Sequence, residues 1–195
     1  MPDKPSYLGL LNSVALAESR AHQYLSAWVA TTSSDEVRCV LATVAAREGE
    51  HGMSFAKRIN ELGFSVLERD DPGFAEKMEV AGSDLSDLEK MERLRLGEAD
   101  EDGPDIFDGF FRDHSIDIQT GELLGRYIAE ERDSARRLRE CHELLRAAAG
   151  SNGHARADDG TRLARVESKV DGLCAAIEQL RDLVADGAGR KAAKR

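Results

Sequence analysis

The chain is poor in aromatic residues, proline and cysteine, and it contains no long hydrophobic run. Aromatic residues make up 5% of its 195 residues, and only four prolines and three cysteines occur. Ala, Leu, Glu and Arg are abundant instead, which is typical of helical proteins. The cysteines, Cys39, Cys141 and Cys174, are odd in number and widely spaced, which argues against a disulfide framework or a four-thiolate metal site. We therefore expect an all-α protein with reduced thiols.

The start of the chain and its charge exclude further classes of protein. Residues 1–6 show no basic region followed by an apolar core, and no window offers the roughly 18 apolar residues that a membrane span needs. We therefore expect a cytoplasmic protein with no membrane partner. A formal net charge of −10 disfavours sequence-independent binding to phosphates. Nucleic acid is accordingly not expected as a partner.

Two segments near the N-terminus each carry an apolar stripe at helical spacing that ionisable residues interrupt. Glu18 and His22 interrupt the stripe of a helix expected over 6–30, and Glu48 and His51 interrupt that of a second helix, which Gly63 should end. A short turn between them would place Glu18 and Glu48 at similar height in a hairpin. Buried ionisable groups are normally paired, hydrogen-bonded or bound to a metal, and Glu with His suits iron, manganese or zinc. The alternative is a buried hydrogen-bonded network, and for His22 a bond to a carboxylate is favoured.

The following elements show weaker patterns. Residues 65–82 predict a crossing loop with room for a short turn near 74–78, and helices are expected over about 84–96 and from 117 or 120 to 149. The pairs Ser33 with Glu36 and Ser86 with Glu89 have the spacing of capping boxes, which predicts where two of the helices begin. The main domain should therefore span 1–149.

The C-terminal part predicts an assembly element. Residues 150–160 have the composition of a flexible linker, and the segment 161–186 carries an unbroken heptad seam. Its a positions are mostly β-branched and its d positions mostly Leu, which favours a parallel coiled-coil dimer, and hence a homo-oligomer. The alternative is that this helix packs onto the chain's own bundle as a fifth helix. The basic tail 187–195 is expected to be disordered.

These motifs together resemble the ferritin-like superfamily, and within it the di-iron domain of the rubrerythrins, over about residues 6–148. Glu18 resembles the family's first ligand, and Glu48-Gly-Glu-His51 matches its Glu-x-x-His motif. The resemblance implies a ferritin-like four-helix bundle followed here by a C-terminal coiled-coil helix. It also implies metal ligands from four helices, the last of them where a second His is usual: Glu18, Glu48, His51, Glu89, Glu92, Glu130 and Asp133.

The resemblance also implies an activity. Two iron ions would be bound, with manganese an option at one position, for peroxide or oxygen reduction or for ferroxidase activity. Asp133 leaves open whether the second ion is bound weakly, replaced by manganese or absent, and Glu131 is a substitute ligand if the helix register shifts by one residue. No rubredoxin-type Cys-x-x-Cys pair is present, so an electron-donor protein is implied. The alternative function is a degenerate ferritin-like scaffold that acts in assembly or partner binding through its coiled coil.

Overall fold

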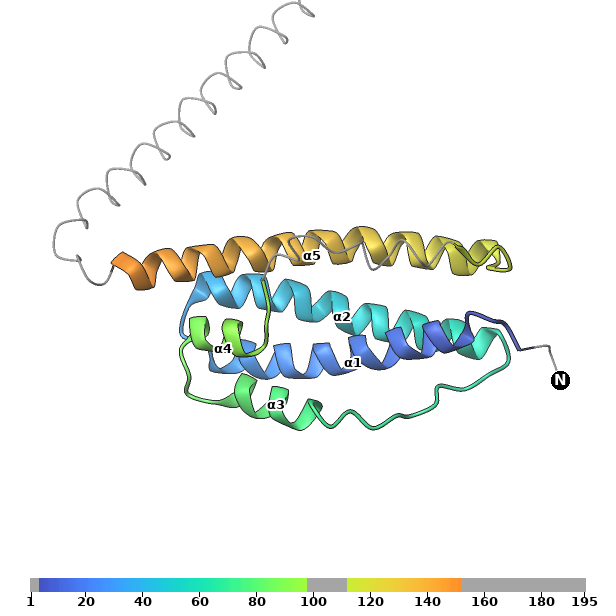
Figure 1. Cartoon of the computed structure of the whole chain (residues 1–195), viewed down its shortest axis with the longest axis horizontal. Helices are drawn as coiled ribbons and strands as arrows, with labels where there is room; N and C mark the ends of the chain where they lie inside the picture. Colours follow the sequence, from blue (N-terminus) through green and yellow to red (C-terminus); the bar gives the residue numbers. More distant parts are fainter. Residues whose placement is uncertain (1–3, 98–111, 152–195) are drawn as a thin grey trace, which may run out of the picture. The chain divides into compact units, whose positions relative to one another are not determined.

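The computed structural model describes residues 4–97 and 112–151, and these ranges contain helices but no strand. The elements are α1 (Leu8–Thr31), α2 (Asp35–Glu61), α3 (Phe74–Gly82), α4 (Asp87–Arg93) and α5 (Ile118–Ser151). Figure 1 shows the long helices α1, α2 and α5 running alongside one another, and α3 packs against α1. The all-α expectation is confirmed.

The described residues cover most of the predicted main domain and end at Ser151, near the start of the predicted linker. Met1–Ala148 forms one compact unit. The predicted linker, coiled coil and tail, together with Cys174, lie almost entirely outside the described residues, so they and the coiled-coil dimer stay predictions. Among the helices that the structure describes, none is long and apolar enough to cross a membrane.

Two apolar clusters hold the long helices together, one toward each end. The first includes Trp28 of α1, Leu41 of α2 and Leu138 of α5, and the second includes Leu11 of α1 and Phe55 of α2. The stripe positions between these clusters are the ones that Glu18, Glu48 and His51 occupy. The bundle therefore contains a polar layer between two apolar ones.

Ser34 and Gly63 determine where α2 begins and ends. The expected N-cap Ser33 is wrong by one residue: Ser34 is the N-cap, and its Oγ accepts a hydrogen bond from the Val37 N–H at 3.3 Å. The reason is that Thr32 Oγ1 accepts a bond from the Ser34 N–H, which fixes the turn one residue later. Gly63 ends the helix as expected, with φ +85° and its N–H bonded to a carbonyl of the last turn.

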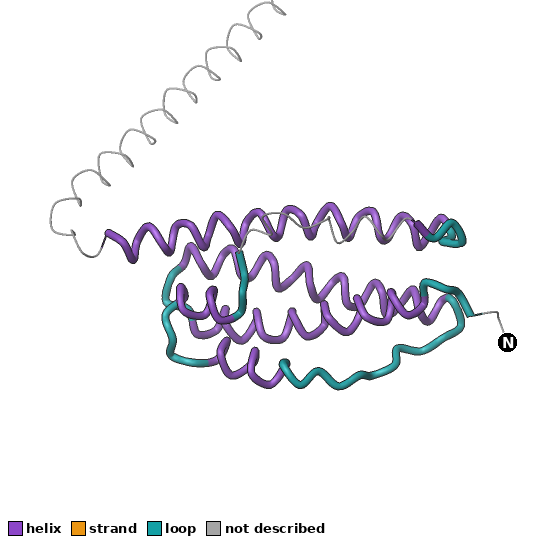
Figure 2. The backbone as a smooth tube through the Cα atoms, in the orientation of Figure 1, coloured by secondary structure: helices purple, strands orange, loops and turns teal. Residues whose placement is uncertain are grey.

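The segment after α2 differs most from expectation. The crossing loop is shorter than predicted because α3 begins at Phe74, and Figure 2 shows the loop that precedes it. The helix expected over 84–96 is present only as the seven-residue α4. The predicted capping box at Ser86 is confirmed, but the helix ends at Arg93, because Arg95 adopts φ +55° and the Leu96 N–H turns back to bond the Met91 carbonyl.

The short helix α4 lies against the C-terminal end of α1. Trp28 Nε1 donates to Asp87 Oδ1 at 2.7 Å, and Lys90 Nζ donates to Thr31 Oγ1 at 2.8 Å. Neither α3 nor α4 is long enough to be a fourth bundle helix. In the described ranges the bundle therefore consists of α1, α2 and α5.

Candidate metal centre

Carboxylates surround the imidazole of His51 in the polar layer. The ring Nε2 lies 2.7 Å from Glu130 Oε2, and the ring Nδ1 lies 3.6 Å from Glu18 Oε2 and 3.3 Å from Glu131 Oε1. Glu18 and His51 are only 5% and 3% exposed. One ligand atom each from Glu18, His51 and Glu131 lies within 4.8 Å of the other two. Side chains from α1, α2 and α5 thus converge on one point.

The atoms that face one another across this point lack ordinary partners. Glu18 Oε2, His51 Nδ1 and Glu131 Oε1 are buried and make no hydrogen bond. Their separations permit ion pairing, but buried polar atoms are normally satisfied by hydrogen bonds as well. A metal ion between them would satisfy all three, and carboxylate with imidazole is a donor set for iron, manganese or zinc. The residues present therefore fit a metal ion.

Glu48 adds a second buried carboxyl group to the layer. It is 6% exposed, and its side chain hydrogen-bonds that of Glu18. Burial, reinforced by the bond to Glu18 and by its charge, raises the pKa of Glu48 far above its usual range. Burial also acts to raise the pKa of Glu18, but the charge of the His51 imidazolium, the neighbouring Glu48 carboxyl group and the hydrogen bond from Tyr127 lower it. Without a metal, this pair of carboxyl groups therefore keeps one proton at neutral pH.

The charge of His51 follows from the same surroundings. Burial acts to lower the pKa of His51, but the carboxylates of Glu131, Glu18 and Glu130 outweigh it and raise the pKa to about 10. The imidazole is therefore protonated at neutral pH in the metal-free protein. Metal binding at Nδ1 would release this proton, so metal affinity should increase with pH.

Tyr127 and Arg126 of α5 hold two of the carboxylates in place. Tyr127 Oη donates to Glu18 Oε1 at 2.9 Å, and its ring meets the His51 ring edge-on with centroids 5.1 Å apart. Arg126 Nε donates to Glu130 Oε1 at 3.0 Å. Tyr127 was not predicted as part of the site. Its position one helical turn before Glu131, on the same face of the helix, was the available signal.

Two glycines of α2 allow α1 to approach closely at this level. A Cβ on Gly52 would lie 2.5 Å from Ser19 Oγ and 3.1 Å from the Ser19 backbone nitrogen, and one on Gly49 would lie 2.9 Å from His22 Nδ1. His22 Nδ1 is 2.7 Å from the Ala45 carbonyl oxygen. His22 therefore bonds the backbone of α2, and not a carboxylate as expected.

Three of the predicted ligands lie elsewhere. Asp133 is held by arginine side chains, Glu89 caps α4 through Ser86, and Glu92 is exposed on α4. The structure brings together the other four predicted ligands, which are Glu18, Glu48, His51 and Glu130, and it adds Glu131 to them.

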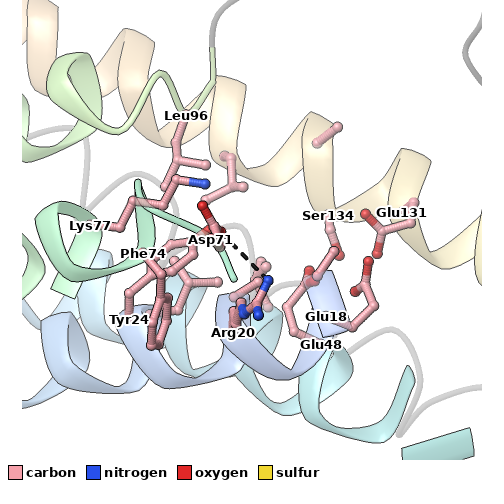
Figure 3. Close-up of a pocket in the computed structure, with 16 residues that line it drawn as sticks. Glu18, Arg20, Tyr24, Glu48, Asp71, Phe74, Lys77, Leu96, Glu131 and Ser134 are labelled. Atoms are coloured by element: carbon pink, nitrogen blue, oxygen red, sulfur yellow. Dashed lines mark ion pairs between the residues drawn. The ribbon is translucent and has the colours of Figure 1, made fainter. Parts of the chain in front are cut away.

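A cavity of about 320 Å³ lies beside the polar layer. Figure 3 shows Glu18, Glu48 and Glu131 at one side of it and Tyr24, Phe74 and Lys77 at the other. Most of its surface is apolar, with contributions from α1, α2, α3 and α5. A small molecule in this cavity would contact the carboxylates of the polar layer directly.

Comparisons of the chain with protein-family models, with curated proteins and with solved structures found no match.

Proposed function

We propose that the protein is a non-haem metal-carboxylate oxidoreductase of the rubrerythrin-like kind, which reduces peroxide or oxygen or oxidises ferrous iron. The observation that carries the proposal is the convergence of three buried, unsatisfied ligand atoms, from Glu18, His51 and Glu131, on one point. Glu48 lies beside them and would complete the coordination, whereas Glu130 lies at the opposite nitrogen of the imidazole, Nε2, and would fix the orientation of the ring. A bound iron or manganese ion would supply the electron exchange with the substrate.

A ferritin-like bundle is part of this proposal. α1, α2 and α5 would be the first, second and fourth helices of that bundle, and Glu18 and His51 are buried on α1 and α2 as the bundle requires. The third helix of that fold, between α2 and α5, has no long counterpart among the described residues.

The remaining side chains of the site have separate tasks. Tyr127 orients the Glu18 carboxylate, and Arg126 orients that of Glu130. Glu48 lines the cavity and belongs to the polar layer as well.

Metal analysis of the full-length protein tests the proposal. Protein expressed in iron-supplemented medium should contain at least one metal ion per chain. His51→Ala and Glu131→Gln should reduce this content, because each removes one of the converging atoms. Glu122→Gln, at an exposed glutamate of the same helix α5, is the matched control and should leave it unchanged.

Activity then distinguishes the enzyme from the scaffold alternative. The loaded protein should consume peroxide or oxygen in the presence of a chemical reductant, or oxidise ferrous iron, and His51→Ala should not. If the unchanged protein contains less than one metal ion per chain, and if its content equals that of His51→Ala, the proposed function is wrong. A scaffold would also show no turnover above free-metal controls.

A further inference from the structure

We infer that the centre binds one metal ion per chain and not the two that the family resemblance implies, because the carboxylates expected to hold the second ion are committed to other bonds. The inference rests on the proposed function, since it concerns the same site. Of the ligands that the family resemblance implies, Glu89, Glu92 and Asp133 would be the ones to hold a second ion, and all three belong to the described residues.

The Glu89 side chain caps its own helix, α4. Its Oε2 accepts bonds from the Ser86 N–H at 3.0 Å and from Ser86 Oγ at 2.6 Å, which closes the capping box of α4. α4 is bonded through Asp87 to Trp28, which lies ten residues beyond Glu18 on α1. Ten residues of helix span about 15 Å, so α4 is fixed far from the polar layer. Glu92 lies on the same short helix, and it is exposed.

The Asp133 carboxylate accepts hydrogen bonds from arginines of two helices. Its Oδ2 accepts from Arg47 Nη1 of α2 at 2.8 Å and from Arg137 Nε at 2.7 Å, and its Oδ1 accepts from Arg136. These are charge-assisted bonds, which are stronger than those between neutral groups. To ligate a metal ion, Asp133 would have to give them up.

The same arginines disfavour a second cation electrostatically. Arg47 precedes Glu48 in α2, and its side chain also donates to Ser134 Oγ at 3.2 Å, so its charge lies beside the polar layer. A guanidinium keeps its charge at any physiological pH. A second metal ion in this neighbourhood would meet a fixed positive charge instead of the neutral His that the family pattern provides.

The unsatisfied atoms also fit a single ion. Three of the four buried side-chain atoms without hydrogen-bond partners in the described residues form the one group around His51 Nδ1. The fourth, His142 Nε2, lies eleven residues beyond Glu131 on α5, which is about 16 Å along the helix. With the Glu48 carboxyl group alongside, four side chains could donate to one iron or manganese ion.

Titration of the metal-depleted full-length protein with Mn²⁺, followed by electron paramagnetic resonance and by metal analysis, tests the inference. One tightly bound equivalent with the signal of a magnetically isolated ion is expected. Glu131→Gln should weaken binding by more than about tenfold. Asp133→Asn and Glu89→Gln should each leave the stoichiometry at one ion, and Glu89→Gln should also leave the affinity unchanged. Circular dichroism checks that each variant is folded, and Glu89→Gln, at an exposed helix cap, perturbs the fold least.

The outcomes separate the two proposals. Two equivalents with a spin-coupled signal, of which one is lost in Asp133→Asn or Glu89→Gln, would overturn the single-ion inference and leave the proposed function standing. No binding of Mn²⁺ or iron by the unchanged protein would overturn the proposed function, and the inference with it.

Discussion

Replacing Gly52 by Ala should force α1 and α2 apart at the level of the metal centre. The new Cβ would lie 2.5 Å from Ser19 Oγ, 3.1 Å from the Ser19 nitrogen and 3.3 Å from its Cα. The hydroxyl could rotate away by giving up its bond to the Ala15 carbonyl oxygen, which is 2.7 Å long. The backbone atoms of Ser19 cannot move without moving α1 itself.

The size of the effect follows from two opposing contributions. Ala in a helix interior is favoured over Gly by about 1 kcal/mol, whereas overpacking a close contact costs about 1–3 kcal/mol, to which the lost Ser19 bond adds about 1 kcal/mol. Gly52→Ala should therefore lower the free energy of unfolding by about 1–3 kcal/mol. Gly125→Ala is the matched reference: it lies within α5, and a Cβ there would meet nothing within 4 Å. This variant should gain about 0.5–1 kcal/mol.

Urea unfolding of the metal-free protein, followed by circular dichroism, measures both values. The stability of Gly49→Ala should lie between those of Gly52→Ala and Gly125→Ala. The new Cβ of Gly49→Ala would meet the His22 side chain, which can rotate away if it gives up its bond to α2. Gly52→Ala should also bind Mn²⁺ more weakly, since Glu18 moves away from His51. Equal stabilisation by Gly52→Ala and Gly125→Ala would refute the argument that glycine sets the distance between α1 and α2.

Two further predictions concern stability. Asp117 accepts bonds from Tyr7 Oη at 2.7 Å and from Arg58 Nη2 at 2.9 Å, and it also caps α5. Asp117→Ala should therefore lower the free energy of unfolding by about 2 kcal/mol and lower the midpoint of thermal unfolding. An unchanged midpoint would contradict a stabilising role of Asp117. In the metal-free protein the stability that His51 contributes is complete below its unfolded pKa of about 6.5 and is lost as the pH rises through its folded pKa of about 10. Burial also raises the pKa of Glu48, which affects stability in the same direction. The urea midpoint should therefore decrease as the pH rises from about 6.5 to about 9.5, and it should decrease less steeply in Glu48→Gln. An equal slope in the two proteins would argue against a protonated Glu48.

The N-terminal half of the site could be predicted because long amphipathic helices determine their own buried face. In α1 and α2 the apolar stripe continues on both sides of Glu18, Glu48 and His51, and their burial is confirmed. Glu89 shows where this reasoning fails. Its spacing from Ser86 predicted a cap and its family position predicted a ligand, and in the structure the short local bond to Ser86 is formed.

The part of the site on α5 could not be predicted from periodicity. Glu130, Glu131 and Asp133 lie close together in a charged stretch, so a shift of one residue turns a different carboxylate toward the core by about 100°. The residue that helps to fix Asp133, Arg47, lies 86 positions away in the sequence. No local pattern indicates such a pair, and only the packing of α5 on α2 brings it together.

The bond between Trp28 and α4 gives this protein an optical probe of one end of its bundle. Trp28 is the single tryptophan of the chain, it is fully buried, and its indole nitrogen is bonded to Asp87. Release of α4 would expose the ring to water and shift its fluorescence to longer wavelength. Tyr127, in contrast, lies within the metal centre against Glu18 and His51. Tryptophan emission therefore reports on the packing of α4 at one end of the bundle, separately from events in the polar layer.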